Sequence, residues 1–200
     1  MHISEGIISA PILISGGALT ACGTLIGIRR LDTDRIMNVS MLTATFFVAS
    51  LIHVPIGPAS IHLVLNGLLG IMLGWACFPA ILTGLLMQAI FFQYGGLIVL
   101  GVNTFNMAFP AVVTYYLVRP LMNRPGGYLA AGFIGGSTAV FLSALCMALS
   151  LAFTDYGFLT TAKITLAANV PVMIIEGLIT MAVLSFIVRV HPDILPGRKP

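Results

Sequence analysis

The chain begins MHISEGIISAPILISGGALTACGTLIGIRR (residues 1–30), a short polar start followed by an apolar run that ends at Arg29 and Arg30. The run from residue 7 to residue 28 contains no charged side chain. An apolar helix of about 17–25 residues is long enough to cross the hydrocarbon core of a bilayer. The opening stretch therefore predicts a transmembrane helix that starts a few residues after the N-terminus.

The rest of the sequence has the same character. It is 58% hydrophobic and only 8% charged, whereas soluble domains carry about a quarter charged residues. We therefore expect residues 1–200 to form one all-α, polytopic membrane helix bundle of about seven transmembrane helices, with a mobile polar tail from about residue 191. The predicted spans cover residues 7–28, 36–52, 60–77, 79–93, a stretch ending at 119, 128–153 and 163–189.

The distribution of charge predicts the orientation and argues against a nucleic-acid partner. Although the net charge is +3, the basic residues gather beside the ends of apolar spans instead of forming one patch. Basic loops of membrane proteins lie mainly on the cytoplasmic side. This places the N-terminus outside and the C-terminus inside. The clustered residues are Arg29, Arg30, Arg35, Arg119, Arg124, Arg189, Arg198 and Lys199, and Lys163 is the exception.

Two segments interrupt the helical pattern. Pro55, Gly57 and Pro58 form a break that a continuous helix does not tolerate. Residues 93–103 are punctuated by glycine and read as a re-entrant or connecting loop, which at membrane depth must be covered by protein or line a cavity. With the predicted orientation, both segments fall at the outer face together with the N-terminus.

The first two residues offer an unusual set of nitrogen atoms. The start lacks the pattern of a cleaved secretory signal, and we expect Met1 to remain with a free amine. The amine, the His2 backbone nitrogen and His2 Nδ1 close two adjacent chelate rings around one metal ion. A further imidazole, for which we choose His62, completes a square, the geometry that suits Ni(II) or Cu(II). His53 is expected to support the ligands or to bind the ion in passing, although loop histidines are more often merely solvated.

Several separated motifs together resemble one family, the substrate-capture membrane component of cobalt/nickel energy-coupling-factor ABC transporters (the CbiM/NikM family). The resemblance spans almost the whole chain, and its motifs occur in the family's order. They are the start Met1-His2-Ile3 with Glu5-Gly6, the segment from His53 to His62, Gln93-Tyr94-Gly95-Gly96, the run from Gly101 through Asn103 to Asn106, and Glu176-Gly177.

The resemblance implies that the N-terminus folds back into the bundle and that Met1, His2 and His62 bind the metal. It also implies that the segment 93–106 covers the site, with His53, Gln93, Asn103 and Asn106 around the ligands. Ni²⁺ or Co²⁺ is then the transported substrate, and no cofactor is expected. The sequence Pro58-Ala59-Ser60-Ile61 departs from the Pro-Gly-Gly-Thr-Ser of many cobalt-type members, which favours nickel slightly.

The sequence also contains no motif for driving transport by itself. No Gly-x-x-x-x-Gly-Lys-[Ser/Thr] phosphate loop and no His-Glu-x-x-His zinc motif occurs. Together with these absences, the resemblance implies a transporter component in a prokaryotic cell membrane, not an enzyme. The resemblance implies a transmembrane coupling subunit, cytosolic ATPase subunits and a small accessory membrane protein as partners. The alternatives are a membrane metalloenzyme that uses the same histidines and a structural or assembly protein.

One charged residue lies inside a predicted span. Ionisable groups within membrane spans are costly and often functional. Glu176 is therefore expected either to make a structural hydrogen bond within the bundle or to take part in coupling or metal passage.

Overall fold

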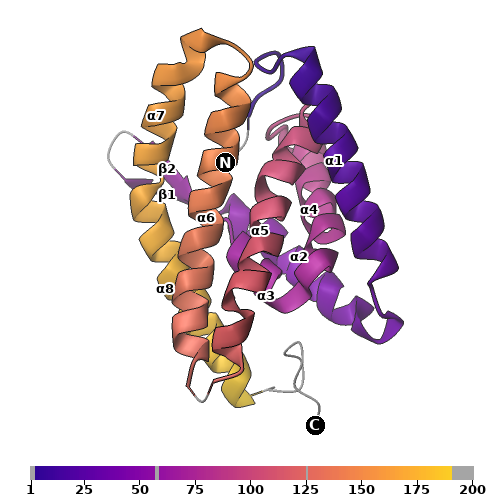
Figure 1. Ribbon diagram of the computed structural model, residues 1–200, viewed down its shortest axis with the longest axis vertical. Coiled ribbons are helices and arrows are strands. Elements are labelled where there is room, and N and C mark those ends of the chain that lie inside the picture. Colours follow the sequence, from indigo (N-terminus) through magenta and orange to yellow (C-terminus); the bar gives the residue numbers. More distant parts are fainter. Residues whose placement is uncertain (1–2, 57–58, 125, 191–200) are drawn as a thin grey trace.

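The computed structural model describes residues 3–56, 59–124 and 126–190. The described chain is a bundle of helices with one small hairpin at its side (Figure 1). Its elements are α1 (Ala10–Arg29), the 3-10 helix η1 (Thr33–Arg35), α2 (Ile36–Leu51), β1 (His53–Ile56), β2 (Ala59–His62), α3 (Asn66–Leu73), the 3-10 helix η2 (Gly74–Ala76), α4 (Cys77–Phe92), α5 (Leu100–Met122), α6 (Tyr128–Ala152), the 3-10 helix η3 (Tyr156–Phe158), α7 (Leu159–Ala168) and α8 (Val170–Val190).

The helix α5 lies at the centre of the bundle. It packs against α1, α3, α4 and α6, and α6 in turn packs against α8. The short helix α3 is buried along its whole length. By contrast, α1, α2 and α8 expose large apolar side chains such as Ile14, Met37 and Phe186. Such a surface suits contact with lipid, since hydrocarbon chains are as apolar as these side chains.

Glycines allow the helices to approach closely. A Cβ added to Gly132 on α6 would lie 2.6 Å from the Cα of Met181 on α8, and one added to Gly27 on α1 would lie 2.5 Å from the Trp75 carbonyl oxygen. Small residues at helix interfaces permit such backbone contact in membranes. Gly23 and Gly27, spaced like a helix-contact motif, both face neighbouring segments.

The membrane character of the chain is confirmed, whereas the predicted number of seven spans is not. Among the described residues, four helical stretches are long and apolar enough to cross a bilayer, namely Ala10–Arg29, Asn66–Phe92, Tyr128–Ala152 and Leu159–Val190. The count of seven spans stays a prediction. Within Asn66–Phe92, the helix is interrupted at Gly74, whose φ of +55° is a left-handed conformation that favours glycine.

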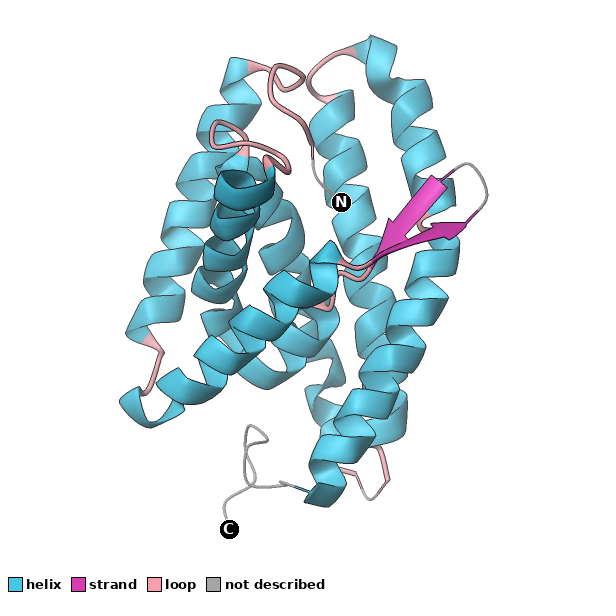
Figure 2. Ribbon diagram, turned by 180° about the vertical axis from the view of Figure 1, so that it is seen from behind, coloured by secondary structure: helices cyan, strands magenta, loops and turns pink. Residues whose placement is uncertain are grey.

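The third predicted span begins later than expected. Residues 60–65 were predicted to be helical, but β2 runs to His62 and α3 starts only at Asn66. The strands β1 and β2 pair antiparallel in a two-stranded hairpin, which projects from the side of the bundle (Figure 2). Pro55 disfavours a helix and the β-branched Val54, Ile56 and Ile61 favour strands. The fold is thus all-helical except for this hairpin.

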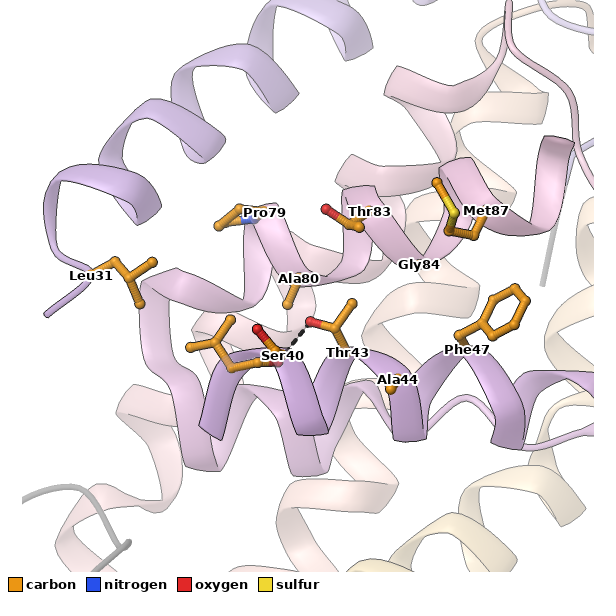
Figure 3. Close-up of a pocket in the computed structure, with 11 residues that line it drawn as sticks. Leu31, Ser40, Thr43, Ala44, Phe47, Pro79, Ala80, Thr83, Gly84 and Met87 are labelled. Atoms are coloured by element: carbon orange, nitrogen blue, oxygen red, sulfur yellow. Dashed lines mark hydrogen bonds between the residues drawn. The ribbon is translucent and has the colours of Figure 1, made fainter. Parts of the chain in front are cut away.

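A groove of about 440 Å³ lies between α2 and α4. Its lining is mostly apolar, with Leu31 and Phe47 near opposite ends and Met87 on α4 (Figure 3). The hydroxyl of Thr43, on the groove wall, donates to the Val39 carbonyl at 2.8 Å and so is satisfied by its own helix. This lining suits an apolar chain better than a metal ion.

Candidate metal centre

The segment that leads from the N-terminus into α1, residues 3–9, is anchored on the bundle through its buried residues Ile3 and Ile8. We call it the N-terminal arm. The Ile3 N–H donates to Asn103 Oδ1 at 3.0 Å, and Asn103 Nδ2 donates to the Ile3 carbonyl oxygen at 3.0 Å. Both residues are buried, and Ile3 lies in a small core with Val102 and Leu151. Because both backbone polar groups of Ile3 are bonded by one side chain, the arm is fixed at its first described residue.

Two further contacts hold the arm. Glu5 Oε1 accepts a hydrogen bond from the Ile98 N–H at 2.9 Å, and the Ser9 N–H donates to Thr154 Oγ1 at 3.4 Å. Ile98 belongs to the loop 93–99. The arm therefore touches the loop before α5, the first turn of α5 itself and the end of α6.

The predicted loop 93–106 is a loop only as far as Val99. From Leu100 onward the chain is helical, so Asn103 and Asn106 lie on the first two turns of α5 and not in a loop. They stand three residues apart and share one helix face. Hydrophobic residues that follow Asn106 make the long helix favourable, and this outweighs the glycines that suggested a loop.

Asn106 carries an unsatisfied donor. Its Oδ1 accepts a hydrogen bond from Ser150 Oγ at 3.3 Å, while its buried Nδ2 has no hydrogen-bond partner in the described chain. A buried polar group without a partner is costly. The expected place of Asn106 around the metal ligands stays a prediction.

The histidines of the hairpin are brought into register. His53 on β1 is the backbone partner of His62 on β2. Met1 and His2 lie outside the described residues, and so do the side chains of His53 and His62. Gln93, expected near the ligands, ends α4 with a left-handed φ of +57° and is exposed. Within the described ranges, no group of three or more His, Cys, Asp or Glu side chains forms a metal cluster.

The chain that follows His62 is anchored by the buried carboxylate of Glu176 on α8. Its Oε1 accepts from the Val64 N–H, and its Oε2 accepts from the Leu65 N–H at 3.0 Å. The structural hydrogen bond expected for this residue is therefore present. Leu65 adopts a left-handed φ of +49°, which is unfavourable for a residue with a side chain.

Asn66, which the sequence analysis missed, fixes the same segment from the other side. Its Nδ2 donates to the Met107 carbonyl oxygen on α5 at 3.1 Å and to Ser143 Oγ on α6 at 2.8 Å. The side chain is fully buried. An asparagine inside an apolar stretch was the signal that could have singled it out, since polar groups within membrane spans commonly bond neighbouring helices.

Comparisons with known proteins identify the family. The family described as "Cobalt uptake substrate-specific transmembrane region" matches residues 2–194. A Haemophilus influenzae protein named for metal transport is 39% identical over 98% of this chain and 97% of its own length. The Archaeoglobus fulgidus protein NikMN, named as a fused nickel transport protein, is 31% identical over 98% of this chain and 68% of its own length.

A solved structure extends the likeness to three dimensions. The crystal structure of a transition metal transporter superposes with a TM-score of 0.84 at 26% identity, covering 96% of this chain and 95% of that chain. The family match covers nearly all residues. Together with the helical membrane fold and the N-terminal arm that is hydrogen-bonded to α5, it leads to one assignment. The chain belongs to the CbiM family, the substrate-specific transmembrane components of cobalt and nickel uptake.

Proposed function

We propose that this protein captures a divalent transition-metal ion, Ni²⁺ or Co²⁺, at the outer face of a prokaryotic cell membrane. It acts as the substrate-capture component of an energy-coupling-factor importer. The observation that carries the proposal is the pair of hydrogen bonds between Ile3 and Asn103. They hold the residue next to His2 inside the bundle, where a metal-binding N-terminus is needed.

The proposed ligands are the Met1 amine, the His2 backbone nitrogen, His2 Nδ1 and the imidazole of His62. Met1 and His2 supply three nitrogens from adjacent residues, so little chain entropy is lost when they bind together. Nitrogen ligands discriminate against Mg²⁺ and Ca²⁺, which prefer oxygen. His53, the register partner of His62, is proposed to support the site.

Nickel is the favoured ion. Four nitrogen atoms in a square suit Ni(II), and NikMN of Archaeoglobus fulgidus is named for nickel transport. The family description names cobalt, so Co²⁺ is the competing substrate. A titration with both ions under the same conditions distinguishes them.

The distribution of arginines supports an orientation with the N-terminus outside. Arg29 ends α1, Arg119 lies in the last turn of α5 and Arg189 in the last turn of α8. These three helix ends lie toward the lower end of the bundle in Figure 1, whereas the N-terminal arm descends from the upper end. Basic residues favour the cytoplasmic side. The proposed partners are a transmembrane coupling subunit, cytosolic ATPases and an accessory membrane protein. The ATPases act on that side.

Isothermal titration with Ni²⁺ tests the proposal. A two-residue extension before Met1 should abolish high-affinity binding, because the extension moves the amine away from the His2 chelate. The same two residues added after Pro200 are the matched control and should leave binding unchanged. His62→Ala should also abolish high-affinity binding, whereas His191→Ala in the C-terminal tail should not. High-affinity binding that survives the N-terminal extension contradicts the proposed ligand set.

A further inference from the structure

The side chain of Glu176 on α8 is fully buried. It accepts hydrogen bonds from two successive backbone N–H groups, those of Val64 and Leu65. Successive N–H groups that converge in this way form a concavity that binds anions. In this protein the anion is a side chain of the chain itself, supplied from α8.

This contact lies two residues from a proposed ligand. β2 ends at His62 and α3 begins at Asn66, so residues 63–65 are the only connection between them. Leu65 has a left-handed backbone conformation, which a leucine rarely adopts unless other contacts stabilise it. The bonds to Glu176 offset that cost and define where the strand ends.

Asn66 holds the other end of the connection. Its amide bonds α5 through the Met107 carbonyl and α6 through Ser143. The connection is therefore tied to α5, α6 and α8 at once, while the N-terminal arm is tied to α5 through Asn103. The arm and the chain that follows β2 are thus both tied to α5.

We propose that Glu176 is a positioning residue for metal capture: by binding the Val64 and Leu65 N–H groups it holds His62 at the correct distance from the N-terminal arm. The inference rests on the proposed function, because it takes His62 as a ligand. It predicts that Glu176 changes the coordination of the metal without touching it. Residues that orient metal ligands commonly change affinity by about 10- to 100-fold when they are replaced.

The experiment compares three variants of the purified full-length protein. Glu176→Leu removes both acceptors at similar volume, and Glu176→Gln keeps one carbonyl oxygen. Thr180→Val is the matched control, since Thr180 lies one turn along α8, is equally buried and has a hydroxyl without a partner in the described chain. Two quantities are measured: the Kd for Ni²⁺ by titration and the visible absorption spectrum of the bound Ni²⁺ or Cu²⁺.

The expected order is graded. Glu176→Leu should weaken binding about 100-fold and shift the absorption spectrum toward that of His62→Ala recorded with excess metal, where the Met1-His2 nitrogens alone bind the ion, while Glu176→Gln should weaken it about tenfold with a smaller shift. Thr180→Val should match the wild type. If Glu176→Leu does not fold, Glu176→Gln decides, and an unchanged Kd and spectrum in that variant overturn the inference.

The outcomes also separate this inference from the proposed function. If the wild type binds no Ni²⁺, or His62→Ala binds as the wild type does, the ligand assignment fails. If His62→Ala fails to bind but both Glu176 variants bind with wild-type Kd and spectrum, only the positioning role is refuted. A partial loss of affinity with an unchanged absorption spectrum also refutes the positioning role. Such a result indicates a general loosening of the fold, which weakens binding without changing the geometry of the ligands.

Discussion

Asn103 and Met107 stand one turn apart on α5, and each holds a different segment of the candidate site. The side chain of Asn103 binds both backbone groups of Ile3, and the carbonyl of Met107 accepts from the Asn66 amide. One helix thus fixes the N-terminal arm and the start of α3 relative to each other. A helix is rigid over a single turn, so the two segments cannot drift apart independently.

Replacing Asn103 with alanine should release the N-terminal arm. The Ile3 N–H and carbonyl would lose their partners in a buried position, which costs about 1–3 kcal/mol for each unsatisfied group unless the arm leaves the bundle. We expect weaker Ni²⁺ binding in titration and faster proteolysis near the N-terminus.

Asn123→Ala is the control for this substitution. Asn123 is an exposed asparagine that follows the far end of α5. Its removal should leave the Ni²⁺ affinity unchanged. Equal affinity in the Asn103 and Asn123 variants would show that the arm does not need its bonds to α5.

The part of the site that could be predicted from the sequence consists of features local to a few neighbouring residues. The nitrogen-rich start, the proline break and the polar residues Asn103 and Asn106 stand out against an apolar background. The family resemblance, which the comparisons confirm, rests on these motifs. The ligand set Met1, His2 and His62 stays a prediction.

The unpredictable part depended on contacts distant in sequence. Glu176 meets residues more than a hundred positions earlier in the chain, and Asn66 is bonded by helices that follow it. The hairpin was also missed, because an apolar run of this length does not by itself distinguish a strand from a helix segment. Buried polar pairs of this kind are fixed by the packing of helices and not by local propensity.

Metal binding should depend on pH in a defined direction. The proposed chelate requires the Met1 amine, the His2 amide nitrogen and two imidazoles to be free of protons, so protons compete with the metal for the same atoms. Affinity for Ni²⁺ should therefore fall as the pH is lowered, and binding should release protons. Titrations in buffers of different ionisation enthalpy measure the number released. A Kd that stays constant between about pH 8 and pH 6, across which imidazoles titrate, would contradict nitrogen ligation.

Packing between α6 and α8 should tolerate no side chain at Gly136. A Cβ there would lie 2.5 Å from the Glu176 carbonyl oxygen and 2.7 Å from Thr180 Oγ1. Gly136→Ala should lower the stability by about 1–3 kcal/mol, the usual cost of overpacking. The midpoint of thermal unfolding in detergent measures this loss.

Gly17→Ala is the matched control for the packing prediction. Gly17 is also a helical glycine, but a Cβ added to it meets nothing within 4 Å. This substitution should be neutral or should stabilise by up to about 1 kcal/mol, because alanine favours the helix more than glycine does. Equal loss in both variants would mean that the helix interface does not explain the result.

The last prediction concerns the loop 93–99, which we propose covers the site, and its contact with the arm. Gly96 has a left-handed φ of +127°, and a Cβ added to it would collide with the Glu5 side chain. Gly96→Ala should therefore push Glu5 away from the Ile98 N–H and loosen the loop. Because a loop that covers a site slows the escape of what is bound, we expect faster release of Ni²⁺ to an excess of chelator. Backbone strain alone would also disturb the loop, and Gly126→Ala controls for it: Gly126 has a φ of +72°, but a Cβ there meets nothing within 4 Å. If the two variants release Ni²⁺ at the same rate as the wild type, the loop does not retain the ion, whereas faster release in the Gly96 variant alone ties retention to the contact with Glu5.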